Sequence, residues 1–354
     1  MNPPKQNLSL AEKLDLLPAM IVVMSAGCFS LFTAITRGEK GAPTLALHIT
    51  YAISRKLSSR LSVKQMQWIS PSTDQVYEQY AHSTKFTPRT VKLAHGGLGH
   101  WMGDIDAPNV LVWYHGGGFC LPANPNYFKF FTHLIESSKA ANKNVAIFIL
   151  TYTLAPTGQY PTQLTQSVEA LRFILTETSR RPSQILLGGD SAGGNLVFGV
   201  LSHLAHPHPS VAELKVSEPL AGAATIAPWT SLQDYPDYKP SVIGDLLNTT
   251  VAGPWASAYL GSAKRDCYTD PHTASADWFA AYPVKQILVT AGENEILLPF
   301  IKTFVNNLRV GFTSVEFFIG KRECHVAPVY NLAAGDVETE QGKTLKQWLR
   351  HILQ

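Results

Sequence analysis

The residues with the clearest chemical potential lie in the stretch QILLGGDSAGGNLVFG, from Gln184 to Gly199. Its centre, Gly189-Asp190-Ser191-Ala192-Gly193, follows one apolar run and precedes another. A glycine cluster between two elements can be a simple turn, because glycine adopts backbone angles that other residues avoid. Between a strand and a helix, however, the pattern G-x-S-x-G indicates a sharp turn that exposes the serine hydroxyl for nucleophilic attack. We therefore predict Ser191 as a nucleophile.

A serine hydroxyl needs a general base, and the base needs an acid that orients it. On a strand-turn-helix framework the order along the chain is Ser, acid, His. His325, in KRECHVAP, follows the last expected strand and is the predicted base, ahead of His272 and His351. The acid should follow the run VKQILVTAG, where the loop holds Glu293 and Glu295 and no aspartate. We favour Glu295, with Glu293 as the alternative; either could instead serve the start of the next helix.

A second glycine cluster could stabilise the negative charge that forms when a serine attacks a carbonyl group. The segment HGGGF, His115 to Phe119, ends another apolar run. Consecutive glycines can direct successive N–H groups to one point, and such donors stabilise an oxyanion. We predict the N–H groups of Gly117, Gly118 and Ala192 as donors, and we expect His115 to hold the loop in place.

The pattern of apolar runs predicts the elements that position these residues. Short runs alternate with helical stripes, which indicates βαβ units and a mainly parallel sheet covered on both faces. About fifty residues rich in Trp, Tyr and Pro interrupt the alternation and predict an insertion at about 230–283. The residues 40–66 look helical, and 70–90 look like a loop. Strands are expected in 109–118, 144–156, 184–190, 220–229, 284–292 and 314–320, and helices in 160–179, 192–205, 297–310 and 336–354.

Composition narrows the class of protein. The chain has 354 residues, of which 45% are hydrophobic and 16% charged, with a net charge of +3. This is enough for one large α/β domain with an accessory cap, and it argues against disorder. No basic run suggests nucleic acid as a partner. The four cysteines are far apart and show no zinc spacing, so we predict no metal site.

The N-terminal segment is unusually apolar. From Leu16 to Thr36, 21 residues carry no charge, which is long enough for a helix that crosses a bilayer. The alternatives are a helix packed on the domain and a signal peptide cut before Cys28. We predict a membrane-associated protein, at the endoplasmic reticulum, with a cytoplasmic location as the alternative. Asn7 and Asn248 both fit glycosylation sequons, and Asn248 should carry a glycan if the catalytic domain faces a secretory lumen.

Three motifs together resemble one family. HGGGF, GDSAGGNL and YTLAPTGQYP are similar to motifs of the hormone-sensitive-lipase-like branch of the α/β-hydrolases, which includes carboxylesterases and arylacetamide deacetylases. The resemblance covers roughly residues 109–350. It implies an eight-stranded, mostly parallel sheet with helices on both faces, an N-terminal helical cap, and ester hydrolysis without a cofactor. It places the triad on Ser191, Glu295 and His325, and the oxyanion donors on Gly117 and Gly118.

The chain also departs from the family pattern. The family usually has Arg and then LAPE, where this chain has Thr153 and Thr157, and its acid is usually Asp. The N-terminal pattern and these changes look most like fungal members, some of which are membrane-associated sterol-ester deacetylases or tailoring enzymes of secondary metabolism.

The resulting prediction is a serine carboxylic-ester hydrolase that acts on a small-molecule ester with a small or hydrophobic acyl group through an acyl-serine intermediate. Acyl transfer and amide or acetyl deacetylation by the same triad are alternatives, as is a receptor without catalysis. The predicted organisation is an apolar segment at 1–40, a cap region at 41–105 and a catalytic domain at 106–354.

Overall fold

The computed structural model describes residues 7–233 and 237–353. Within them, eight strands form one sheet in the order β1-β2-β4-β3-β5-β6-β7-β8. β2 is antiparallel to β1 and β4, and the pairs from β4 to β8 are parallel. The predicted eight-stranded, mostly parallel sheet is therefore confirmed. The first six residues of the predicted N-terminal segment, part of the insertion and the last residue of the predicted terminal helix lie outside the described residues.

The six strands expected from the apolar runs are β3 to β8. The bounds of all strands are β1 Arg89–Lys92, β2 Leu98–Met102, β3 Asn109–Tyr114, β4 Val145–Thr151, β5 Ile185–Asp190, β6 Gly222–Ile226, β7 Ile287–Gly292 and β8 Val315–Gly320. The helices are α1 Leu10–Thr33, α2 Leu45–Arg60, α3 Val63–Ile69, α4 Thr73–Thr84, α5 Pro125–Ala140, α6 Thr162–Glu177, α7 Ala192–Ala205, α8 Ala252–Leu260, α9 Ala276–Ala280, α10 Leu298–Gly311, α11 Ala327–Tyr330 and α12 Glu340–Ile352. Short 3₁₀ turns cover Ala34–Thr36, Ala94–Gly96, Pro182–Gln184, Thr249–Val251, Pro271–Thr273 and Asn331–Ala334.

The prediction of a loop over 70–90 was wrong, because α4 occupies most of it. Ser72 and Gln75 form a capping box at its start, and its buried face consists of Thr73, Val76, Tyr77 and Ala81. This face is narrow and rich in polar residues, which is why the segment resembles a loop in sequence. The short strands β1 and β2 were also not predicted; both lie inside the predicted cap region and yet belong to the sheet.

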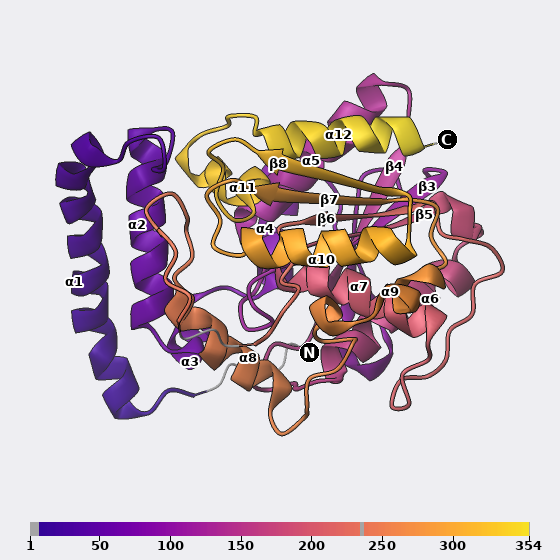
Figure 1. Ribbon diagram of the computed structural model, residues 1–354, viewed down its shortest axis with the longest axis horizontal. Helices are drawn as coiled ribbons and strands as arrows, with labels where there is room; N and C mark the ends of the chain where they lie inside the picture. The colour runs from indigo at the N-terminus through magenta and orange to yellow at the C-terminus, as the bar shows by residue number, and fades with distance from the viewer. Residues whose placement is uncertain (1–6, 234–236, 354) are drawn as a thin grey trace.

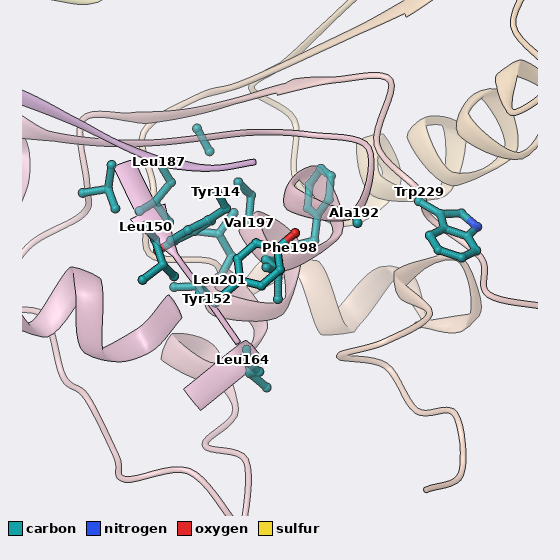
Figure 2. Packing of buried hydrophobic residues seen from close by; sticks show 14 of the residues in the cluster. Tyr114, Leu150, Tyr152, Leu164, Leu187, Ala192, Val197, Phe198, Leu201 and Trp229 are labelled. Atoms are coloured by element: carbon teal, nitrogen blue, oxygen red, sulfur yellow. The ribbon is translucent and has the colours of Figure 1, made fainter. Parts of the chain in front are cut away.

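Helices cover both faces of the sheet (Figure 1). In β3, Val110, Val112 and Tyr114 belong to one hydrophobic cluster, and Leu111 and Trp113 belong to another, because side chains of a strand alternate between its faces. The first cluster includes residues of α6, α7 and α10, and part of it around α7 is seen in Figure 2. The second includes residues of α4, α5 and α12. The helices packed on the two faces of the sheet hold the carboxyl ends of the parallel strands at a single edge.

The cap consists of α1, α2 and α3 at one end of the sheet (Figure 1). α1 packs along α2 and buries a single stripe, made of Ala19, Val23, Gly27 and Ser30. Polar contacts fix the pair at both ends. Arg60 Nη1 donates to Asp15 Oδ2 over 2.9 Å, and Thr33 Oγ1 lies 3.0 Å from His48 Nε2. The segment expected to be a membrane helix is thus also a packed helix of the cap.

Candidate active site

Ser191 occupies the sharp turn between β5 and α7. Its backbone angles, φ 50° and ψ −118°, are ones that a residue with a side chain rarely adopts. The flanking glycines are required by close approach: a Cβ on Gly193 would lie 1.9 Å from the Tyr114 carbonyl oxygen, and one on Gly189 would lie 2.4 Å from the Gly193 oxygen. The Ser191 N–H donates to the Ile226 carbonyl over 2.9 Å, which ties the turn to β6. A strained turn of this kind between a strand and a helix has the geometry that a nucleophile elbow requires.

The predicted acid and base meet at the ends of β7 and β8. His325 follows β8 and is 2% exposed, and Glu295 follows β7 and is 4% exposed. Glu295 Oε1 lies 3.5 Å from His325 Nδ1, while Oε2 accepts the Gly292 N–H over 2.7 Å. The orientation leaves Nε2 of the imidazole as the nitrogen that faces away from the acid. Ser191 and His325 line the same cavity, and Glu295 contacts the imidazole from the side of Nδ1.

The other candidates lie elsewhere. Glu293 is exposed, and its Oε2 accepts the Arg322 N–H over 2.9 Å. His351 is exposed on α12, and the His272 N–H donates to the Thr230 carbonyl in the insertion. Of the two glutamates in the loop, the structure places Glu295 at the imidazole.

Burial dominates the electrostatics of the triad. It raises the pKa of Glu295 to about 8, against the lowering effect of the Gly292 N–H. Burial also lowers the pKa of His325, while the carboxylates of Asp245 and Asp190 raise it. The imidazole is therefore neutral near pH 7, as a general base must be.

The glycine-rich loop lies beside the elbow. Gly117 and Gly118 have φ values of 98° and 60° and line the same cavity as Ser191. A Cβ on Gly118 would lie 2.1 Å from Trp255 Cε3, so the indole covers this part of the loop. Asp190 fixes the loop to the elbow, because its Oδ1 accepts the Gly116 N–H over 3.2 Å and the Trp113 indole N–H over 3.1 Å. Gly117 and Gly118 thus lie at the same cavity as Ser191, and Ala192 follows the serine at the start of α7.

His115 is a structural residue, as expected. It is fully buried, and its Nδ1 lies 2.8 Å from the Gly116 oxygen. Its ring stacks on Tyr152 with a centroid distance of 4.3 Å, and the Tyr152 hydroxyl donates to the His115 carbonyl. Burial lowers the pKa of His115 to about 4, so it carries no charge near pH 7.

The cavity above Ser191 has a volume of about 160 Å³ and a mostly apolar wall. The cap contributes Leu57 and Met66, and the insertion contributes Leu246, Val251 and Trp255. A larger hollow of about 630 Å³ lies at the opposite ends of the parallel strands, beside β1 and the end of α6. Ser191, His325, Gly117 and Gly118 line the smaller cavity.

Sequence reasoning missed Asp245. This residue lies in the insertion and is fully buried, and it accepts the His325 N–H over 2.9 Å. It stands in no motif and far from the triad in sequence, so no local signal could have found it. The cap residue Gln67 was also missed; its amide donates to the carbonyls of Cys120 and Ala155 and joins α3 to the glycine-rich loop.

The fold and the geometry above define an α/β protein with a Ser–His–Glu arrangement at the carboxyl ends of its parallel strands. Comparison with known proteins gives the family: the profile of the alpha/beta hydrolase fold matches residues 111–328, more than half of the chain. The chain belongs to this family. The membership that the three motifs predicted is confirmed.

Several curated relatives are similar over part of the chain. Steryl acetyl hydrolase 1 of Saccharomyces cerevisiae is 30% identical over 34% of this chain and 27% of its own length. Arylacetamide deacetylase-like 2 of Homo sapiens is 26% identical over 43% of this chain and 37% of its own length. Carboxylesterase NlhH of Mycobacterium tuberculosis is 33% identical over 27% of this chain and 29% of its own length. The chain spans about a third of the length of such relatives.

Solved structures share the fold over most of the chain. An esterase of the bacterial hormone-sensitive lipase family superposes with a TM-score of 0.67, at 19% identity, over 88% of this chain and all of that one. Carboxyl esterase 2 of Tuber melanosporum gives a TM-score of 0.64 at 19% identity, over 80% of this chain and all of that one.

Proposed function

We propose that the chain is a serine carboxylic-ester hydrolase that uses Ser191, His325 and Glu295. The observation that carries the proposal is the meeting of Ser191 and His325 at one cavity, with Glu295 Oε1 3.5 Å from the imidazole. The curated relatives support it, because their names describe an acetyl hydrolase, a deacetylase and a carboxylesterase.

The geometry supports a two-step reaction. His325 takes the proton of the Ser191 hydroxyl as the oxygen attacks the acyl carbon, and Glu295 orients the imidazole. The N–H groups of Gly117, Gly118 and Ala192 receive the oxyanion. His325 then donates the proton to the leaving alcohol, and an acyl-serine remains. Water that gives its proton to His325 attacks the acyl carbon, the bond to Ser191 breaks, and the acid is released.

We propose a short acyl group for the substrate. A cavity of about 160 Å³ is small beside the roughly 300–1,000 Å³ of pockets that hold drug-sized ligands. Trp255 above Gly118 limits the depth available to an acyl chain near the nucleophile. The name of the yeast relative, an acetyl hydrolase, agrees with this size.

Hydrolysis of nitrophenyl esters of increasing chain length tests both parts of this proposal. Acetate and butyrate esters should be cleaved, and the octanoate ester should be cleaved much more slowly. A fluorophosphonate probe should label Ser191 with one equivalent per chain. Absence of both labelling and hydrolysis would favour the receptor without catalysis, and faster cleavage of the octanoate would contradict the short acyl group. A competing alcohol that captures the acyl group would favour acyl transfer.

We further propose that α1 contacts a membrane with its outward face while it stays packed on α2. The segment Leu10–Thr36 is long and apolar enough to span a bilayer, but 22% of its most apolar window is buried in the protein. Spanning would draw the adjacent α2, with Arg55, Lys56 and Arg60, into hydrocarbon at high cost. A stripe of exposed residues runs the length of α1 and consists of Leu10, Leu14, Leu17, Ile21, Met24 and Leu31. The location of the protein at the endoplasmic reticulum stays a prediction.

Flotation with phosphatidylcholine vesicles tests this arrangement. The wild-type chain should float with the vesicles, and Ile21→Asp should reduce the floated fraction severalfold. Val310→Asp is the matched control, because Val310 is 75% exposed on α10, away from α1. Equal flotation of wild type and Ile21→Asp would contradict the proposal. Protection of α2 from protease by the vesicles would instead indicate a spanning helix pair.

The sequon at Asn248 has a position that matters for the cavity. Asn248 lines the cavity, and its Oδ1 accepts the Thr250 N–H over 3.1 Å. A glycan there would begin at the cavity wall. Glycosylation stays a prediction, and a change of mobility on enzymatic deglycosylation tests it.

A further inference from the structure

Asp245 links the two loops that carry the acid and the base. Its Oδ1 accepts the backbone N–H of His325 over 2.9 Å, and its Oδ2 accepts the N–H of Ile296, the residue after Glu295, over 2.9 Å. The Leu246 N–H adds a third hydrogen bond over 2.7 Å. The carboxyl group is fully buried, and burial raises its pKa, while the His325 imidazole and the N–H groups of Ile296 and His325 act against that rise. One side chain of the insertion therefore holds the backbone on both sides of the Glu295–His325 contact.

That contact is sensitive to small displacements. A separation of 3.5 Å between Glu295 Oε1 and His325 Nδ1 is longer than the usual range of about 2.7–3.2 Å for an N–H···O hydrogen bond. A shift of either loop by a fraction of an ångström would lose it, and misplacement of a catalytic group by about 1 Å can cost about 100-fold in rate. The backbone anchors of these loops thus matter for turnover.

We infer that Asp245 is a positioning residue of the proposed catalytic triad, which fixes the loops of Glu295 and His325 in register. This inference rests on the proposed function. Asp245 acts through the other two residues and has no assigned contact with the substrate.

The cap supports the same residue from outside. Arg55 of α2 donates a hydrogen bond to the Asp245 carbonyl oxygen. The residue that holds the two loops is thus itself held, through its backbone, by a cap helix, and α2 also contributes Ser54, Leu57 and Ser58 to the cavity wall. Cap and triad are mechanically connected through residue 245.

The charge of Asp245 gives the inference a readout that packing alone would not move. The carboxylate raises the pKa of His325, against the larger lowering effect of burial. Removal of the negative charge should therefore lower the pKa of His325 further, and the acidic limb of the kcat/KM profile should move to lower pH. The other charged or titratable groups that face this pair are Asp190 beneath the elbow, Glu295, Cys324 of the base loop, Arg55 and Tyr51 of α2, and Tyr238 of the insertion.

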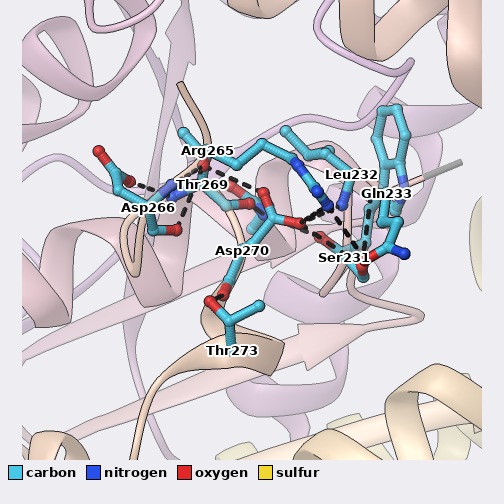
Figure 3. A network of polar contacts seen from close by, with 10 residues as sticks. Ser231, Leu232, Gln233, Arg265, Asp266, Thr269, Asp270 and Thr273 are labelled. Atoms are coloured by element: carbon cyan, nitrogen blue, oxygen red, sulfur yellow. Dashed lines mark hydrogen bonds and ion pairs between the residues drawn. The ribbon is translucent and has the colours of Figure 1, made fainter. Parts of the chain in front are cut away.

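Asp270 offers a matched control. It is another fully buried aspartate of the insertion, and it accepts the Leu232 N–H over 2.8 Å and the Thr269 hydroxyl over 3.1 Å. Figure 3 shows it within a network that also includes Ser231 and Arg265. Its hydrogen bonds secure the insertion to itself and reach neither triad loop.

The experiment compares Asp245→Asn, Asp270→Asn and wild type in the full chain. Active sites are counted with a fluorophosphonate, and nitrophenyl acetate hydrolysis is followed from pH 5 to pH 9. Asparagine at 245 keeps the shape but places an N–H₂ group against one backbone N–H. We expect kcat per titrated site to fall about 10- to 100-fold with little change in KM, and the acidic limb to move to lower pH. Asp270→Asn should lower thermal stability and leave both readouts unchanged.

The outcomes separate the two proposals. If the wild-type chain neither reacts with the probe nor hydrolyses the ester, the proposed function fails. The positioning role is overturned if the wild-type chain is active, Asp245→Asn has a normal kcat per titrated site, and the acidic limb of its kcat/KM profile stays at the wild-type pH. Should Asp245→Asn not fold, Arg55→Gln releases the same residue from the cap side and should lower kcat per titrated site severalfold; an unchanged value would overturn the inference.

Discussion

Two apolar helices of this chain differ in how much of their surface is buried. α7 begins at the nucleophile, and every residue from Ala192 to His203 is buried between the sheet and its covering helices. α1 is longer and equally free of charge over most of its length, yet it buries a single stripe against α2. Hydrophobicity alone does not decide whether a helix enters the core. The difference lies in how many neighbours the topology supplies, because α7 connects two parallel strands and α1 connects none.

The largest expected difference between the helices is chemical. Ser191→Ala removes the nucleophile at the start of α7 and should lower kcat by roughly 10⁶-fold. Ser25→Ala in α1 removes a hydroxyl that donates to the Ile21 carbonyl and should leave kcat unchanged. Both variants should keep the circular dichroism spectrum of the wild type. Measurable acyl transfer by Ser191→Ala above background would mean that another residue attacks the ester.

Alanine substitutions at glycines of the two helices should differ in their effect on stability. Gly193→Ala in α7 forces a Cβ to within 1.9 Å of the Tyr114 carbonyl, which cannot move away, so the free energy of unfolding should fall by about 4 kcal/mol or more. Gly27→Ala in α1 meets the flexible end of Ile53 at 3.1 Å. Its gain in helix propensity, about 1 kcal/mol, should offset the contact. Urea unfolding measures both values; similar losses at the two sites would show that α1 is as tightly enclosed as α7.

An aspartate introduced into α7 should also destabilise the fold much more than one introduced into α1. Val197→Asp places an unpaired carboxylate in the core and should destabilise the fold by about 3 kcal/mol or more. Ile21→Asp, on the 58% exposed side chain of α1, should change the free energy of unfolding by less than about 0.5 kcal/mol in the absence of lipid. Thermal unfolding in detergent-free buffer measures both. A large loss for Ile21→Asp would show that a protein surface covers this face.

The smallest expected effect concerns pH, and its sign differs between the two regions. Burial raises the pKa of Asp190, just before α7, from 3.8 to about 6, so its contribution to stability is greatest below pH 4 and is lost as pH rises to about 6. The Arg60 guanidinium lowers the pKa of Asp15 in α1 from 3.8 to about 2, so its contribution is present above pH 4 and is lost as pH falls to about 2.

Stability curves of Asp190→Asn and Asp15→Asn test these signs. The first variant should lose the part of the slope between pH 4 and pH 6. The second should differ from wild type above pH 4 and converge with it near pH 2. A difference for Asp15→Asn that grows as pH falls would contradict the lowered pKa.

The parts of the site that could be predicted from the sequence are those formed by short runs of contiguous residues. The elbow, the glycine-rich loop, the acid loop and the base loop each follow an apolar run, and parallel strands bring their ends to one edge. Asp245 could not be predicted, because its role depends on a long insertion folding back over the sheet. The helix α4 was missed because its buried face is narrow. Whether α1 is covered is a question of topology, to which its uniform composition gives no answer.

The indole of Trp255 forms the ceiling over Gly118, and it comes from α8 of the insertion and not from the sheet. The strands that carry the catalytic residues and the side chain that limits the length of the acyl chain therefore lie in separate stretches of the sequence. Redesign of substrate size can concentrate on α8, where exchange of one aromatic residue for a smaller one deepens the chamber while the strands that align the nucleophile stay as they are.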